Sequence, residues 1–401
     1  MKLRHLLITS ICSLLILSSC TNKNTSSDSS STSDSQEENK IEDYETNKRL
    51  KDAHGDEYAT EYMDISYRDS NDMIFNSYKN GAKNDNGFAP NGNKDYKGTY
   101  KSVFDLIVPD QIAKNQNNQE TVVLMLYGGS WTMGSKTDSY VVEYMEKYAQ
   151  EGNITASMTY SLFPTTYVSN NSVSVFKMLD EIDACIKSIK NKLESLNIST
   201  QNTKLVLGGY SAGGHLATLY GYSRPQASAI PLDFILDIVG PVSLHISDWK
   251  IYVDDSLRVD LSPEQIAIQE QNANLTQHLD DYMILGLVDA MVGSPYSLAE
   301  VMNEGNNVFS NLREDLSGNP TDQVSPINFI KDGSLPTLMA YAGRDSVVGV
   351  KQYASMKPLL DTHNVRNELF YFHNSTHYLE NDEEVKEQFM QRISSWIDGD
   401  Y

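Results

Sequence analysis

Short apolar runs alternate with amphipathic stretches along much of this chain. The segments with strand character are residues 62–67, 100–108, 121–127, 153–160, 205–207, 234–239, 337–341 and 368–372. Continuous apolar runs such as 121–127 are typical of strands that are buried on both faces of a parallel sheet. The pattern therefore predicts a sheet that is covered on both sides.

Helical periodicity occupies several of the intervals between these runs. From Phe176 to Leu193, apolar residues recur once per helical turn, which predicts an amphipathic helix of about 22 residues. Further helices are expected directly after Ser211 and over residues 350–363 and 383–397. Strands that alternate with helices indicate an α/β protein with a mostly parallel sheet and helices on both faces.

Residues 244–325 interrupt this alternation. They show helical patterning and no obvious strand. We expect this insertion to form a helical cap above the carboxyl ends of the strands, where α/β proteins place their sites.

The first twenty residues have the pattern of an export signal. Lys2 and Arg4 precede the apolar segment 6–17, which is too short to span a bilayer but is typical of a secretory signal. The following Leu-Ser-Ser-Cys ending resembles a bacterial lipobox, in which the cysteine is lipidated and becomes the first mature residue. We therefore expect a signal peptide over 1–19 and a lipidated Cys20; the alternative is an ordinary signal peptide with a chance cysteine.

Lipidation at Cys20 would attach the protein to a bacterial cell membrane, facing outside the cytoplasm, through acyl chains such as palmitate. Residues 21–40 are rich in serine and contain no large apolar residue, which indicates a flexible tether. We assign residues 20–54 to the lipidated cysteine and this serine-rich, acidic tether, and residues 55–401 to the folded domain.

Charge and cysteine content exclude several classes of function. The formal net charge of −22 over 401 residues argues against nucleic acid as a partner. Cys12 would leave with the signal, so Cys185 is the one thiol left beside Cys20, and it lies on the apolar side of a predicted helix as a core residue. The sequence contains no metal-ligand cluster, phosphate loop or dinucleotide fingerprint, so we expect no metal and no cofactor.

The pentapeptide Gly209-Tyr210-Ser211-Ala212-Gly213 joins the apolar run 205–207 to a predicted helix. A G-x-S-x-G motif between a strand and a helix holds its serine on a sharp bend with the hydroxyl exposed above the sheet. A Cβ at either flanking glycine would crowd the strand and helix that meet there. Ser211 is therefore the candidate nucleophile.

A serine hydroxyl needs a base to remove its proton and a third group to orient that base. Asp345 follows the run 337–341, and His377 follows the run 368–372, so both lie on loops just past buried strands. We predict that Asp345 orients His377 and that His377 is the base.

Other residues of the same types fit less well. His373 stands at a strand end, where a side chain is more often buried among neighbours, and His215 lies on the helix after the motif, where it is expected to pack. Asp332 precedes a strand and Asp361 ends a helix, so neither occupies the position expected of the acid.

Hydrolysis also needs donors for the oxyanion that develops on the carbonyl. The loop Tyr127-Gly128-Gly129-Ser130-Trp131 follows a buried strand, as does the glycine loop that supplies one or two such backbone N–H groups. Ala212, directly after the candidate nucleophile, would supply another.

These motifs together resemble the α/β-hydrolase fold of carboxylesterases, close to the hormone-sensitive-lipase and bacterial feruloyl-esterase-like groups. The residues that carry the resemblance are 127–131, 160–164, 209–214, 325–326, 343–345 and 377. The resemblance implies Ser211 as nucleophile, His377 as base and Asp345 as orienting acid. It also implies the backbone groups of Gly129, Ser130 and Ala212 as oxyanion donors. The resemblance covers most of the chain from about residue 60 to the end and gives the domain over 55–401 an α/β-hydrolase fold, but the insertion 244–325 has no counterpart in these families, and we expect substrate specificity to lie there.

Two residues depart from the pattern of these families. Tyr127 stands where a histidine is usual, and Ser161 stands where many members have arginine. Both family residues shape the loop and do not perform the chemistry, so the resemblance still implies an active enzyme.

The sequence as a whole predicts an extracytoplasmic serine carboxylesterase that acts through an acyl-enzyme intermediate on a small-molecule or polysaccharide ester. One alternative is a serine peptidase of the same fold, and another is a lipoprotein that binds without catalysis. No feature of the sequence predicts an oligomeric state.

Overall fold

The computed structural model describes residues 45–68, 102–114, 120–163, 173–245, 248, 288, 291–292 and 319–401. All of them belong to one unit, Ile41–Tyr401. The predicted signal peptide, Cys20 and most of the predicted cap lie outside the described residues.

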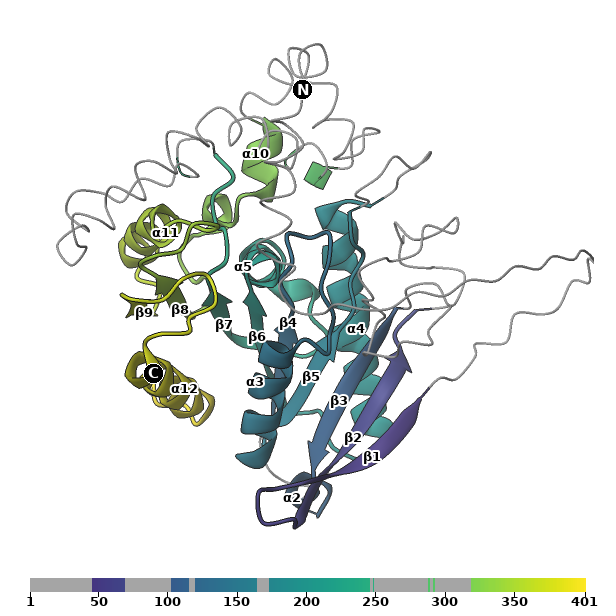
Figure 1. Ribbon diagram of the computed structural model, residues 1–401. Coiled ribbons are helices and arrows are strands. Elements are labelled where there is room, and N and C mark those ends of the chain that lie inside the picture. Colours follow the sequence, from purple (N-terminus) through teal and green to yellow (C-terminus); the bar gives the residue numbers. More distant parts are fainter. Residues whose placement is uncertain are drawn as a thin grey trace, which may run out of the picture. The chain divides into compact units, whose positions relative to one another are not determined.

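A nine-stranded sheet forms the centre of this unit, with the strand order β1-β2-β3-β5-β4-β6-β7-β8-β9 (Figure 1). Neighbours from β5 to β9 are parallel, whereas β1, β2, β3 and β5 pair antiparallel. The strands are β1 Thr46–Lys51, β2 Glu57–Ser66, β3 Val103–Pro109, β4 Thr121–Leu126, β5 Ile154–Met158, β6 Lys204–Tyr210, β7 Leu232–Ile238, β8 Thr337–Ala342 and β9 Asn367–Phe372. The expected mostly parallel sheet is confirmed.

Helices follow the strands and cover the sheet. They are α2 Asp110–Lys114, α3 Ser139–Gln150, α4 Val175–Ser195, α5 Ala212–Ser223, α10 Asn319–Val324, α11 Lys351–Thr362 and α12 Glu383–Ile397, with short 3-10 turns at Pro225–Ala227 and Pro326–Phe329. In Figure 1, α3 lies on the near side of the sheet and α4 on the far side. Every residue of β3, β4, β5 and β8 is buried, because helices and neighbouring strands surround them. This burial explains why their sequences are largely apolar, with Asp105 on β3 and Thr155 and Ser157 on β5 as buried polar residues.

The helix expected between Phe176 and Leu193 is α4. Its N-terminus is capped by Ser174, whose side chain accepts a hydrogen bond from the amide of Lys177 at 3.2 Å. Cys185 is fully buried on this helix, as the sequence predicted, and burial raises the pKa of its thiol well above the ordinary value. It is a core residue.

The sheet begins earlier in the chain than the sequence indicated. β1 falls inside the range that was assigned to the tether, so the boundary at residue 55 lies too late. β1 is an edge strand with mostly exposed side chains. Its backbone pairs antiparallel with β2, and surface ion pairs of Lys48 with Glu61 and Arg49 with Glu57 accompany this pairing. An exposed, charged strand has the composition of a linker, which explains the error.

Within the described parts of the chain, no helix has the length and apolarity required to cross a membrane. Of the expected cap, α10 is the longest described piece. Buried Val288 and Met291 also belong to it.

Candidate active site

The loops that follow β4, β6, β8 and β9 emerge at one edge of the sheet, because these strands are parallel (Figure 1). They carry, in turn, the glycine loop, Ser211, Asp345 and His377. Binding sites of open α/β sheets lie at this edge. The topology therefore gathers all the predicted site segments in one place.

Ser211 occupies a strained turn between β6 and α5. Its backbone has φ 55° and ψ −117°, a conformation that residues with a Cβ rarely adopt. The turn is held on both sides, because the amide of Ser211 donates to the carbonyl of Ile238 at 2.8 Å and its carbonyl accepts from the amide of His215 at 3.0 Å. This is the geometry of a nucleophile elbow.

The two glycines of the motif allow the close approach of strand, turn and helix. A Cβ on Gly209 would lie 2.1 Å from the carbonyl oxygen of Gly213, and a Cβ on Gly213 would lie 2.3 Å from that of Leu126. No side chain fits at these distances, so the crowding predicted from the sequence is confirmed.

The side chain of His377 is hydrogen-bonded to that of Asp345. The imidazole Nδ1 lies 2.6 Å from Asp345 Oδ2, and the other carboxylate oxygen accepts from the amides of Val347 and Val348 at 2.8 Å each. A carboxylate can only accept, so Nδ1 carries the proton and Nε2 is left with a free lone pair. The His377 side chain is 10% exposed and that of Asp345 is 0% exposed, so solvent reaches the imidazole and not the acid.

The other histidine and aspartate candidates have different roles. His373 is exposed, contrary to the burial expected at a strand end, and its ring lies edge-on against Tyr371 at 4.5 Å. Asp332 pairs with His363 at 2.6 Å, and Asp361 pairs with Lys357 at 2.8 Å, both on the surface.

Tyr210 links the Ser211 turn to the His377 loop. Its hydroxyl donates to the carbonyl oxygen of His377, and its ring lies edge-on to the imidazole with centroids 5.7 Å apart. The glycine loop touches the same turn, because a Cβ on Gly128 would lie 3.0 Å from the Cβ of Ser211. The structure thus brings together the segments that carry all of the predicted site residues.

The glycine loop has an unusual backbone. Gly129, Ser130 and Trp131 all have positive φ, at 114°, 52° and 58°, and the carbonyl of Gly129 accepts from the amides of Thr132 and Met133 at 3.0 Å each. Among the described residues, the amides of Gly129, Ser130 and Ala212 donate to no protein acceptor. They are the amides that the resemblance implied as oxyanion donors.

His215, on α5, links the glycine loop to the end of α10. Its Nδ1 accepts from the indole N–H of Trp131 at 3.2 Å, so Nε2 is the protonated nitrogen and donates to the carbonyl of Val324 at 2.8 Å. Complete burial lowers the pKa of His215 to about 4, so the ring is neutral. The expectation that this histidine packs is confirmed, and the structure shows which segments it joins.

Tyr127 and Ser161, the two residues that depart from the family pattern, each make specific buried contacts. Tyr127 stacks on Tyr160 with centroids 4.2 Å apart, and the Tyr160 hydroxyl donates to the carbonyl of Tyr127 at 2.7 Å. Ser161 donates its amide and its hydroxyl to buried Glu181 at 2.7 and 2.5 Å. Burial raises the pKa of Glu181, and Lys177 at 3.6 Å opposes this shift.

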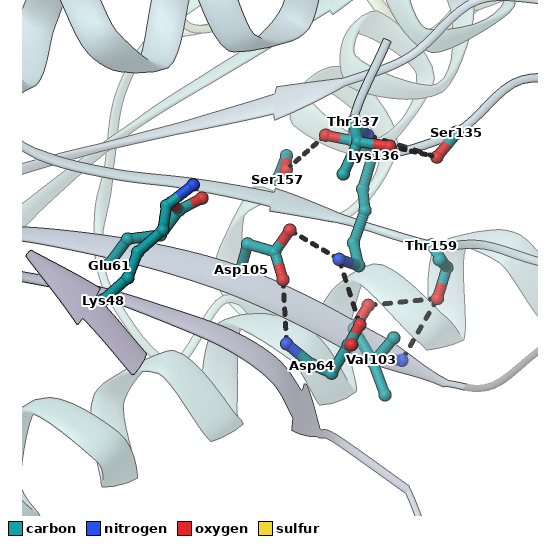
Figure 2. A network of polar contacts seen from close by, with 10 residues as sticks. All are labelled: Lys48, Glu61, Asp64, Val103, Asp105, Ser135, Lys136, Thr137, Ser157 and Thr159. Carbon is teal, nitrogen blue, oxygen red and sulfur yellow. Dashed lines mark hydrogen bonds and ion pairs between the residues drawn. The ribbon is translucent and has the colours of Figure 1, made fainter. Parts of the chain in front are cut away.

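A buried lysine, Lys136, lies between the glycine loop and α3 (Figure 2). Lys136 Nζ lies 2.5 Å from Asp105 on β3 and 3.1 Å from Asp64 on β2. Its backbone carbonyl accepts from the hydroxyl of Ser157 on β5 at 2.8 Å. Burial raises the pKa of Asp105, and the ammonium group opposes this. Lys136 therefore connects the segment between the glycine loop and α3 to β2, β3 and β5.

A buried acid next to the Ser211 elbow was not among the residues predicted from the sequence. Asp237 on β7 is fully buried, and burial raises the pKa of its carboxyl group to about 7. The Tyr341 hydroxyl lies 2.6 Å from Asp237 Oδ2 and 2.6 Å from the carbonyl of Gly240, while the Gly240 amide donates to Asp237 Oδ1 at 3.1 Å. The signal for it was present: an aspartate inside the apolar run Phe234–Ile238.

In the described part of the chain, no group of three or more histidine, cysteine, aspartate or glutamate residues could hold a metal ion.

The comparisons with known proteins agree with this architecture. The BD-FAE family model matches residues 105–360, and no curated protein matches the chain. A solved truncated carbohydrate esterase from gut microbiota superposes with a TM-score of 0.51 at 13% identity, covering 86% of this chain and 96% of its own.

Two further solved structures superpose less closely. The propionate-bound esterase Est2 from the Planctomycetes species Thermogutta terrifontis has a TM-score of 0.46 at 16% identity, covering 74% of this chain and 89% of its own. An acetyl ester-xyloside bifunctional hydrolase from Caldicellulosiruptor lactoaceticus has a TM-score of 0.46 at 15% identity, covering 75% and 89%. These two likenesses carry no argument here, and at 13% identity the carbohydrate esterase bears on the fold alone.

The family match spans more than half of the chain, from β3 into α11, and it includes the Ser211 elbow and Asp345 but ends before His377. Together with the parallel sheet and the elbow geometry, this match identifies the fold expected from the sequence. The chain belongs to the BD-FAE family and is an esterase-type α/β-hydrolase.

Proposed function

We propose that this protein is an extracytoplasmic serine carboxylesterase in which Ser211 is the nucleophile, His377 the general base and Asp345 the acid that orients it. The observation that carries the proposal is the His377–Asp345 hydrogen bond of 2.6 Å. This bond keeps the imidazole proton on Nδ1, so that the lone pair of Nε2 can accept the proton of Ser211. Tyr210 ties that base to the strained turn that holds Ser211.

The reaction proceeds in two half-reactions. Ser211 Oγ attacks the ester carbonyl carbon while His377 Nε2 takes the hydroxyl proton. The tetrahedral intermediate collapses, its bond to the alcohol oxygen breaks, and His377 returns the proton to the leaving alcohol. Water, deprotonated by the same nitrogen, then attacks the acyl-enzyme and releases the carboxylic acid, and the proton goes back to Ser211.

The amides of Gly129, Ser130 and Ala212 supply the oxyanion hole of this mechanism. They act on a charge that exists only in the intermediate and its transition states, so each contributes to the rate and little to substrate binding. Loss of one such donor typically raises the barrier by about 3–4 kcal/mol.

The substrate is the ester of a small molecule or of a polysaccharide, outside the cytoplasm. The solved carbohydrate esterase with the same fold is consistent with this class. We further propose that Cys20 bears the lipid anchor and that the serine-rich residues after it form the tether. Metabolic labelling with palmitate in a bacterial host tests the anchor: the label is expected on the wild type and absent from Cys20→Ala. Equal labelling of both proteins would exclude Cys20.

The catalytic proposal is tested with a fluorophosphonate probe and a substrate panel. We expect wild-type protein to be labelled and to hydrolyse nitrophenyl esters, and Ser211→Ala to lose both properties with an unchanged melting temperature. Turnover of aminoacyl-nitroanilides without ester turnover would favour the peptidase alternative. A wild-type protein that takes up no probe and cleaves no ester would leave the binding lipoprotein as the remaining explanation.

A further inference from the structure

The variable second position of the G-x-S-x-G motif is filled here by a tyrosine with a specific contact. Tyr210 is 8% exposed, and its hydroxyl donates to the backbone carbonyl of His377. Because Tyr210 directly precedes Ser211, a movement of the His377 loop relative to the elbow must stretch this one hydrogen bond. This hydrogen bond therefore depends on the relative position of the His377 loop and the Ser211 elbow.

A second tyrosine extends the connection to the glycine loop. Tyr140, in the first turn of α3, packs its ring on Tyr210 with centroids 4.7 Å apart. Its hydroxyl accepts from the amide of Gly128 at 2.7 Å and donates to Asp138 at 3.3 Å. The amide of Gly128 is thereby occupied, which leaves the next amides of the loop to face the substrate.

Both tyrosine hydroxyls are committed donors. Burial raises the pKa of each far above its ordinary value, and nearby acids, Asp345 for Tyr210 and Asp138 for Tyr140, raise it further. The hydroxyls therefore keep their protons near neutral pH and remain donors in these hydrogen bonds.

The hydrogen bond from Tyr210 holds the backbone of the His377 loop. The loop runs from the end of β9 to α12, and among the described residues the imidazole of His377 makes its hydrogen bond to Asp345 and ring contacts with Tyr210 and Tyr378. His377 is 8% exposed, and a buried backbone carbonyl without a donor destabilises the folded state. Tyr210 supplies that donor and so fixes the main chain from which the imidazole projects.

We propose that Tyr210 and Tyr140 are positioning residues, a two-ring brace that holds the His377 loop and the glycine loop in register with the Ser211 elbow. The assignment rests on the proposed esterase function for its kinetic consequences and on geometry alone for its structural ones. Neither tyrosine touches the reacting atoms. Each acts through the group that it holds.

The experiment compares Tyr210→Phe and Tyr140→Phe with Tyr148→Phe. Tyr148 is a matched control, because its buried hydroxyl also donates to a backbone carbonyl, that of Met390 at 3.2 Å, between α3 and α12 and outside the site. All three variants keep the ring and lose one hydroxyl. Melting temperature, kcat and KM on a nitrophenyl ester, and the far-downfield proton resonance of His377 Nδ1 are measured for each, and His377→Gln assigns that resonance by removing it.

We expect Tyr210→Phe to lower kcat by about tenfold, the rate equivalent of one lost hydrogen bond, with KM little changed. Its Nδ1 resonance is expected to shift or broaden, because the imidazole is no longer fixed through its main chain. Tyr140→Phe is expected to lower kcat without altering the resonance, since it frees the Gly128 amide and not the His377 loop. Tyr148→Phe is expected to change stability alone.

Kinetics and resonance of Tyr210→Phe that match those of Tyr148→Phe would overturn the brace. If the wild type proves to have no esterase activity, the proposed function fails, and the resonance still decides whether Tyr210 positions His377. An unmoved resonance in Tyr210→Phe refutes the brace whatever the activity of the wild type.

Discussion

Replacing Asp237 by asparagine is expected to change how the stability of the protein depends on pH. The Tyr341 hydroxyl lies 2.6 Å from Asp237 Oδ2 and 2.6 Å from the carbonyl of Gly240. One hydroxyl proton cannot serve two acceptors. A protonated Asp237 resolves this, because it donates to Tyr341 while Tyr341 donates to Gly240.

The size of the effect follows from the pKa of Asp237. Burial raises this pKa from 3.8 to about 7 in the folded protein, a shift of about three units or about 4 kcal/mol. The folded state therefore holds a proton that the unfolded chain releases, and the contribution is fully present below pH 3.8. It is lost as pH rises through about 7.

His215 acts in the opposite direction over nearly the same range. Its pKa falls from 6.5 to about 4 on folding, so its contribution is fully present above pH 6.5. That contribution is lost as pH falls toward about 4, by about 3 kcal/mol. In the wild type the two groups nearly cancel between these values. Single substitutions separate them.

Urea unfolding of the wild type and Asp237→Asn, followed by circular dichroism between about pH 4 and pH 8, measures the difference in free energy of unfolding at each pH. We expect this difference to move in favour of the variant by several kcal/mol as pH rises, because the other titrating groups are common to both proteins. In His215→Gln the trend relative to wild type should have the opposite sign. A difference for Asp237→Asn that is the same at every pH would refute the assignment of a protonated, buried Asp237.

Three further substitutions test other parts of the site. Lys136→Met leaves two carboxylates without their buried cation and is expected to lower the free energy of unfolding by about 3–5 kcal/mol in urea, whereas a loss below 1 kcal/mol would show that the pair is solvated. Gly213→Ala places a methyl group against the carbonyl of Leu126, so we expect loss of fluorophosphonate labelling, and full labelling would contradict the described elbow. Ser161→Ala removes one donor from buried Glu181 and is expected to cost about 1–3 kcal/mol of stability, measured by the same unfolding experiment; an unchanged midpoint would mean that another group satisfies the carboxylate.

The central strands and the elbow could be predicted because their causes are local. Burial on both faces makes a strand such as β4 a continuous apolar run, and the crowding at Gly209 and Gly213 requires glycine at a fixed spacing. β1 has no such signal, because its side chains are mostly exposed and charged and it is defined by its backbone pairing with β2. α3 was missed although its buried residues, Val141, Tyr144, Met145, Tyr148 and Ala149, recur at helical spacing.

The same distinction applies to the site. The order of Ser211, Asp345 and His377 along the chain follows from the strand order, so the sequence indicated which loops would carry them. The contact between Tyr210 and His377 joins residues far apart in sequence, and so does the contact of Ser161 with Glu181. Such pairs depend on the exact packing of loops, which no spacing in the sequence records.

The hydrogen bond between Trp131 and His215 places a fluorescent side chain in the glycine loop. Trp131 is one of three tryptophans in the chain, it is 3% exposed as a residue, and it directly follows Ser130. Indole emission is sensitive to its hydrogen-bond partner and its solvent shell, so any displacement of the loop during turnover alters the protein's own fluorescence. The intrinsic fluorescence of Trp131 can therefore follow movement of the glycine loop without an attached dye.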